Sequence, residues 1–168
     1  MAKKTAYMGM LVALAFIFSY IESLIPINVG IPGIKIGLAN MVTIVTLYTI
    51  GVVPAVVLSL VRIVLTGFTF GNLAMMMYSL GGGMLSLLVM GIARKTKLFS
   101  ITGVSVLGAV FHNIGQIIVA AIVVENSSLF YYLPVLLVSG VVFGVVIGMV
   151  GAVLVKRLSG FIQKQDIF

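Results

Sequence analysis

Cysteine is absent from this sequence, and only three of its 168 residues are acidic. The lack of cysteine excludes disulfides, thiolate metal sites and cysteine nucleophiles. Charged residues make up 8% of the chain and hydrophobic residues 62%, with a mean hydropathy of +1.34. Ordinary globular proteins carry roughly 25% charged residues. The composition therefore excludes a soluble enzyme and a disordered tail. The net charge of +7 comes from too few basic residues to form a nucleic-acid-binding face.

Long uncharged stretches dominate the chain and indicate membrane-spanning helices. Crossing the hydrocarbon takes about 20 apolar residues. Four stretches are longer than this and carry no charge, at 36–61, 63–93, 98–124 and 126–155. A shorter apolar stretch begins at Thr5, continues past Glu22 and ends at Pro26. We predict one all-α membrane domain over residues 1–168, with six helices at about 6–25, 35–51, 54–67, 72–93, 101–124 and 132–155.

The second and third helices are predicted to separate between Gly51 and Pro54, because glycine and proline interrupt helices. The third is then short for a full span. The basic residues still favour six helices, since an even number places every basic cluster on one side of the membrane. That side is the cytoplasm, so both termini are predicted to be cytoplasmic. The basic residues are Lys3, Lys4, Arg94, Lys95, Lys97, Lys156, Arg157 and Lys164, whereas the opposite loops carry Lys35 and Glu125.

Small residues at four-residue spacing mark helix faces that another backbone can approach closely. The sixth helix carries such a face, which we expect to pack within the bundle. The first helix carries Gly9 and Ala13 near its cytoplasmic end, where packing and docking of a membrane partner are both open. Gly81-Gly82-Gly83 in the fourth helix either permits close packing, which we favour, or marks a break facing a ligand. The face of the sixth helix consists of Gly140, Gly144, Gly148 and Ala152.

Few polar side chains lie within the predicted spans. Each is informative, because a charge at mid-helix costs about 2.5–3.5 kcal/mol on insertion scales. The topology places these groups at a similar depth, on the outer side of four different helices. They are Asn40 and Thr43 on the second helix, Arg62 on the third, Tyr78 on the fourth, and His112, Asn113 and Gln116 on the fifth.

Two interpretations of these polar groups are open. They could form interhelical hydrogen bonds, each contributing about 0.6 kcal/mol, and for Asn40 alone we favour this. Arg62 together with His112, Asn113 and Gln116 favours a solute-binding cavity open to the exterior. Arg62 could instead extend to the outer interface or pair with Glu22.

The sequence contains few of the residue patterns that catalysis requires. One histidine does not make a metal site, and the three acids form no paired-carboxylate motif for acid–base catalysis or Mg²⁺ binding. There is no phosphate-binding glycine loop, so the chain is not expected to hydrolyse ATP itself. We expect no cofactor, and any active transport would draw on an ion gradient or a partner.

Three segments together resemble one bacterial family. They are residues 33–40 (GIKIGLAN), 78–86 (YSLGGGMLS) and 108–116 (GAVFHNIGQ). With the six-helix length, they resemble the "Gx transporter" family, also named heptaprenyl diphosphate synthase component I, over about residues 7–155. That family is similar to the substrate-binding S components of energy-coupling factor (ECF) transporters. S components are six-helix membrane proteins that bind vitamins and pair with a transmembrane T component and two cytoplasmic ATPases.

The resemblance implies an S-component-like bundle in the bacterial cytoplasmic membrane. Its outer cavity would bind a small vitamin- or cofactor-like solute, and Gly9 and Ala13 would match the small-residue surface that meets the T component. The synthase name fits the sequence poorly, since prenyl diphosphate synthases need Asp-rich Mg²⁺ sites. A component of prenyl diphosphate synthesis and a scaffold that binds no solute stay as alternatives. The solute site implied is Asn40, Arg62, Tyr78, His112, Asn113 and Gln116.

Overall fold

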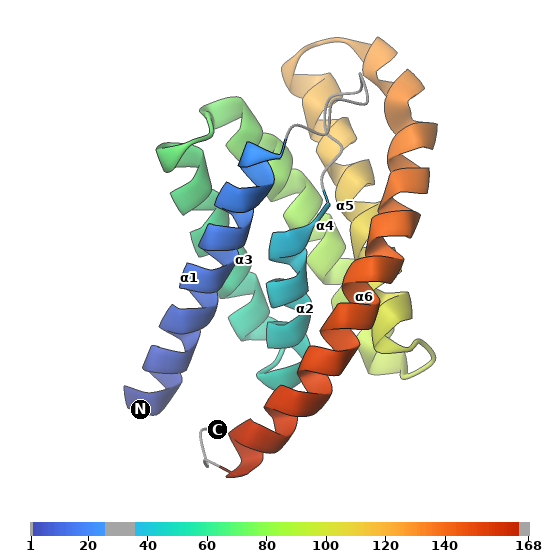
Figure 1. The fold of residues 1–168 in the computed structure, drawn as a ribbon. Helices are drawn as coiled ribbons and strands as arrows, with labels where there is room; N and C mark the ends of the chain where they lie inside the picture. The colour runs from blue at the N-terminus through green and yellow to red at the C-terminus, as the bar shows by residue number, and fades with distance from the viewer. Residues whose placement is uncertain (1, 26–35, 165–168) are drawn as a thin grey trace.

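The computed structural model describes residues 2–25 and 36–164, and these residues form helices without any strand (Figure 1). The prediction of an all-α bundle is confirmed. The helices run alternately up and down, with the start of the first and the end of the last at the same end of the bundle. The elements are α1 (Ala2–Leu24), α2 (Leu38–Thr49), α3 (Val52–Thr69), α4 (Leu73–Thr96), α5 (Ile101–Val123), the 3₁₀ helix η1 (Ser127–Tyr132) and α6 (Leu133–Lys164).

Five of these helices are long and apolar enough to cross a membrane, and the sixth apolar helix, α2, is shorter. The chain is therefore a multi-pass membrane protein. The expectation that the third helix is the short one was wrong. α3 has 18 residues because it begins at Val52 and continues to Thr69, and Pro54 is accommodated in its first turn. Proline is tolerated there because the first backbone N–H groups of a helix have no intrahelical partner.

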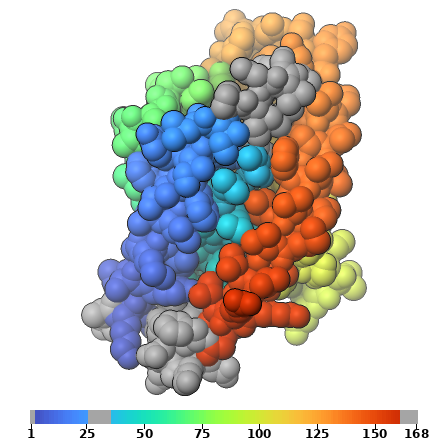
Figure 2. Space-filling model, viewed as in Figure 1, coloured from blue at the N-terminus to red at the C-terminus, as the bar shows by residue number. Residues whose placement is uncertain are grey.

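α2 is the central helix of the bundle. Its 12 residues make it roughly 18 Å long, much less than the hydrocarbon thickness of about 30 Å. It contacts α1, α3 and α6, with a few contacts to α5, and in Figure 2 its atoms are visible only between α1 and α6. Every residue from Val42 to Leu47 is buried. A helix this short is possible because its surroundings are other helices, so its ends need not reach the membrane surfaces.

Glycines set both ends of α2. Gly37 precedes it with φ of 85°, and Gly51 follows it with φ of 135° and ψ of −177°. Residues with a side chain rarely adopt either conformation. The predicted helix break after α2 is therefore confirmed, and it occurs at Gly51. The predicted start at residue 35 lies outside the described residues, and the described helix begins at Leu38.

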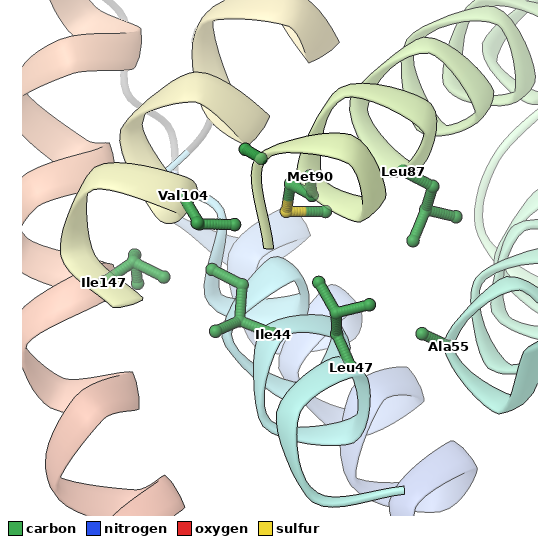
Figure 3. Close-up of a cluster of buried hydrophobic side chains, with 8 residues drawn as sticks. Ile44, Leu47, Ala55, Leu87, Met90, Val104 and Ile147 are labelled. Atoms are coloured by element: carbon green, nitrogen blue, oxygen red, sulfur yellow. The ribbon is translucent and has the colours of Figure 1, made fainter. Parts of the chain in front are cut away.

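The hydrophobic core lies around the cytoplasmic half of α2 (Figure 3). Ile44 and Leu47 of α2 are buried against side chains from α3, α4, α5 and α6, and no single neighbour accounts for the burial. This arrangement fixes α2 in position relative to the other helices. The partners in this cluster are Ala55, Leu87, Met90, Ala93, Val104 and Ile147.

Glycines allow α4, α5 and α6 to approach closely. A Cβ at Gly82 would lie 2.6 Å from the carbonyl oxygen of His112, and one at Gly115 would lie 2.7 Å from that of Gly81. α4 is continuous through Gly81–Gly83, so the glycine triplet serves packing and does not break the helix. On α6, a Cβ at Gly144 or Gly148 would lie within 2.8 Å of the α5 backbone. The packing interpretation of both glycine patterns is confirmed.

The basic residues gather at one end of the bundle. The start of α1, the end of α6 and the α4–α5 turn lie at the lower end in Figure 1. These segments carry Lys3, Lys4, Arg94, Lys95, Lys97, Lys156 and Arg157. Arg94 also lies over the ring of Tyr48, with its guanidinium carbon 5.3 Å from the ring centroid. By the distribution of positive charge this end faces the cytoplasm. Lys35, expected on the opposite side, lies outside the described residues.

Candidate functional site

A small polar cavity lies in the outer half of the bundle, with residues from all six membrane helices in its wall. Its volume is about 50 Å³. Five of the six side chains predicted for a solute site line it: Asn40, Arg62, His112, Asn113 and Gln116. Residues more than 70 positions apart in the sequence therefore meet at one place. The remaining wall consists of Glu22, Ile36, Gly37, Ala39, Ser79, Ala109, Gly140 and Phe143.

Tyr78 is the predicted site residue that does not line this cavity. Its neighbour Ser79 does. Consecutive residues of a helix project about 100° apart, so a polar residue in the right turn can still face away from the site. The sequence offered no way to choose between Tyr78 and Ser79, because both are polar and lie at the same depth.

Arg62 has few hydrogen-bond partners for a charged group in this position. Its Nη1 donates to the Ser19 hydroxyl across 3.5 Å, at the limit of a hydrogen bond. Its Nε is buried, and no described residue accepts a hydrogen bond from it. Glu22 attracts the guanidinium electrostatically. The side chain therefore keeps donor capacity that the described residues do not use.

Glu22 has a defined position between α1 and α2. Its Oε1 accepts a hydrogen bond from the backbone N–H of Gly37, with N and O 2.5 Å apart. A carboxylate at the start of a helix is favoured by the helix dipole. This contact joins the outer end of α1 to the start of α2, next to Asn40. The sequence suggests Glu22 as a possible partner of Arg62, but not as a residue of the site itself.

Asn113 forms an interhelical hydrogen bond. Its Nδ2 donates to the carbonyl oxygen of Leu136 on α6, 2.6 Å away, and the Ser139 hydroxyl donates to the same oxygen. Gly140 makes room for this contact, because a Cβ there would lie 3.0 Å from Nδ2. Asn113 therefore serves, at least through its Nδ2, as an interhelical hydrogen-bonding residue, which is one of the two interpretations of the polar groups. His112 lies against Gly82, with its ring within 3.2 Å of where a Cβ would be.

A family model described as heptaprenyl diphosphate synthase component I matches residues 11–154. The chain belongs to the heptaprenyl diphosphate synthase component I family. No curated protein and no solved structure matches. The match confirms the family that three sequence segments resemble, and the name "component I" implies a second component. The likeness to ECF S components stays an expectation.

The cavity of this family member offers polar contacts of several kinds. Arg62 is a cationic donor, while the amides of Asn40 and Gln116 both donate and accept. Within residues 2–25 and 36–164, no three side chains of His, Cys, Asp or Glu gather as a metal site would require. The residues present therefore suit recognition of a polar or anionic group.

Proposed function

We propose that the protein is the solute-binding membrane subunit of an ATP-driven importer of the ECF type. In this role it captures a small vitamin- or cofactor-like solute in the outer cavity. A transmembrane T component and cytoplasmic ATPases then drive its reorientation. The main support is Arg62, whose buried Nε has no partner among the described residues and lies at a cavity with walls from six helices. A solute with an acceptor group would complete its hydrogen bonding.

A scaffold without a solute explains this arrangement less well. Buried polar networks that only hold helices together are normally satisfied internally, because an unpaired buried group costs about 1–3 kcal/mol. Asn113 fits that description, since its amide bonds to Leu136. Arg62 does not fit it. A charged side chain within a membrane-spanning segment is typical of a functional site.

The exposed face of α1 supports docking of a membrane partner. Gly9 and Ala13 are both exposed, and no described atom lies within 4 Å of a Cβ placed at Gly9. Gly140, Gly144 and Gly148 of α6, in contrast, lie against α5. α1 therefore presents a small-residue face that the described residues do not cover, near the end that would meet cytoplasmic ATPases. Another helix can approach closely there.

The family name favours a second candidate, a component of heptaprenyl diphosphate synthesis. Such an enzyme condenses diphosphates with Mg²⁺, which is bound by carboxylates. The acids among the described residues are Glu22 and Glu125, on α1 and beyond the end of α5. The described part of the chain therefore offers no carboxylate pair for this chemistry, and a catalytic partner would have to supply it.

Two assays separate these candidates. The first extracts the purified protein and identifies small molecules by mass spectrometry, with Arg62→Gln purified in parallel as the control. A solute present with the wild type and absent from the variant supports binding in the cavity. The second measures Mg²⁺-dependent condensation of isopentenyl diphosphate, alone and with the proteins that co-purify. Condensation that depends on this chain, without a bound solute, would favour the synthase component.

A further inference from the structure

A second cavity adjoins the polar one at Arg62. It has a volume of about 340 Å³ and lies between α1, α3 and α4 at the outer end of the bundle. Glu22, Arg62 and Ser79 line both cavities. The two spaces are therefore neighbours across these three side chains, and one ligand could contact both.

The two volumes suit different parts of a ligand. A water molecule needs roughly 10–15 Å³ of cavity volume, so the polar cavity of about 50 Å³ holds a few waters or one small head group. Ligand sites typically measure about 300–1,000 Å³, and the second cavity falls within this range. A vitamin-sized molecule whose head lies in the polar cavity therefore has room for its remaining atoms in the second one.

Part of the wall of the second cavity is suited to an apolar group, while Ser19, Ser23 and Thr66 contribute polar groups to the rest. Ile63, Phe70, Met75 and Met76 contribute to the apolar part, and methionine side chains adapt readily to different apolar shapes. The ring of Phe70 also lies against the α1 rings, 5.6 Å from that of Phe16 and 5.5 Å from that of Tyr20 between centroids. These contacts hold α1 against the end of α3 beside the cavity.

The charges at the junction favour an acidic head. The Arg62 guanidinium keeps a buried donor, Nε, from which no described residue accepts a hydrogen bond. Glu22 accepts a hydrogen bond from the backbone N–H of Gly37 and also attracts Arg62, and the unused Arg62 donor can still bind a second anion. Guanidinium groups match carboxylate and phosphate oxygens geometrically and bind them through strong, charge-assisted hydrogen bonds.

We propose that the adjoining cavities bind one amphipathic anion, with its carboxylate or phosphate head at Arg62 and a single apolar tail between α1, α3 and α4. This inference depends on the proposed function, because it names the class of solute for the same site. It predicts that head and tail both contribute to binding, and that neither is sufficient alone.

The test uses the full chain in phosphatidylcholine nanodiscs and a single-chain alkyl phosphate with a photoreactive diazirine at its far end. After illumination, labelled peptides are located by mass spectrometry. We expect labelling between Phe70 and Met76, reduced at least tenfold in Arg62→Gln and retained in part in Arg62→Lys. The matching alcohol has the same tail without the phosphate. It should label this segment no more than it labels helices that face the lipid.

A second variant tests the tail without removing the charge. Ser23 lines the second cavity and is exposed, so Ser23→Trp should fill this space and reduce labelling, while Ser23→Ala should not. Thermal unfolding of each variant checks that the bundle is intact. Labelling that is unchanged in Arg62→Gln would overturn the inference. The same holds if unlabelled inorganic phosphate competes with the labelling as effectively as unlabelled alkyl phosphate does. If a hydrophilic solute without a tail binds in an Arg62-dependent way, the amphipathic class is wrong and the proposed function stands.

Discussion

The carboxylate of Glu22, near the end of α1, accepts a hydrogen bond from the backbone N–H of Gly37, immediately before α2. This contact connects the first two helices at the wall of the polar cavity. It also places a negative charge where it attracts Arg62 of α3. One side chain therefore helps to position three helices around the site.

Removal of the Glu22 carboxylate should destabilise this junction. Glu22→Ala leaves the Gly37 N–H without its acceptor, and we expect a loss of about 1–3 kcal/mol in the free energy of unfolding. Glu22→Gln keeps a carbonyl acceptor and removes only the charge, so it should lose less. Thermal unfolding in one detergent measures both. Equal melting temperatures for the wild type and Glu22→Ala would show that the contact does not support the fold.

A methyl group at Gly82 should disturb the packing of α4 on α5. Its Cβ would lie 2.6 Å from the carbonyl oxygen of His112, which is backbone and cannot move aside easily. We expect Gly82→Ala to cost about 1–3 kcal/mol of stability. Gly9→Ala is the matched control, since no described atom lies within 4 Å of that position. If both variants unfold at the wild-type temperature, the close approach of α4 and α5 is not as described.

Asn113 and Tyr78 should respond differently to substitution. Asn113→Ala loses the hydrogen bond to Leu136, so we expect weaker solute binding together with a loss of about 0.6–1.7 kcal/mol in stability. Tyr78→Phe should leave binding unchanged, because Tyr78 does not line the cavity. Binding of the co-purified solute and thermal unfolding are measured for both variants. A large binding defect in Tyr78→Phe would place the solute elsewhere.

Enlarging the exposed face of α1 should prevent docking while the site stays intact. Gly9→Leu or Ala13→Leu is expected to abolish co-purification with a T component and to leave solute binding within about twofold of wild type, since neither residue lines the cavity. Gly160→Leu is the control, because a side chain at this exposed glycine also meets no described atom within 4 Å. Normal co-purification of the α1 variants would remove the support for docking at this face.

Much of the fold follows from the sequence because membrane insertion leaves strong signals. Charge-free stretches predict the helices, and the basic residues predict their orientation. The prediction of a short third helix fails because proline is acceptable within the first turn of α3, so the helix begins at Val52, and because it continues past Gly67 to Thr69. Sequence periodicity does not report that α2 is surrounded by other helices. That fact explains why 12 residues suffice.

Part of the candidate site could be predicted from the sequence for a similar reason. Arg62, Asn40 and Gln116 stand out as rare polar residues in apolar helices, and common depth was enough to group them. The sequence does not show how α4 is rotated about its axis, so it cannot tell that Ser79 faces the cavity and that Tyr78 does not. Gly140 and Phe143 carry no polar signal at all, and only the packing of α6 against α5 brings them to the cavity.

The central claim is that Arg62 binds a solute within the bundle. The most direct measurement is native mass spectrometry of the intact chain released from nanodiscs, comparing wild type with Arg62→Gln at matched thermal stability. The account predicts one discrete additional mass on the wild type, bound about once per chain, and its loss in Arg62→Gln, because a charge-assisted hydrogen bond contributes about 1.5–3 kcal/mol. The same bound mass on both proteins, or none on either, would contradict it.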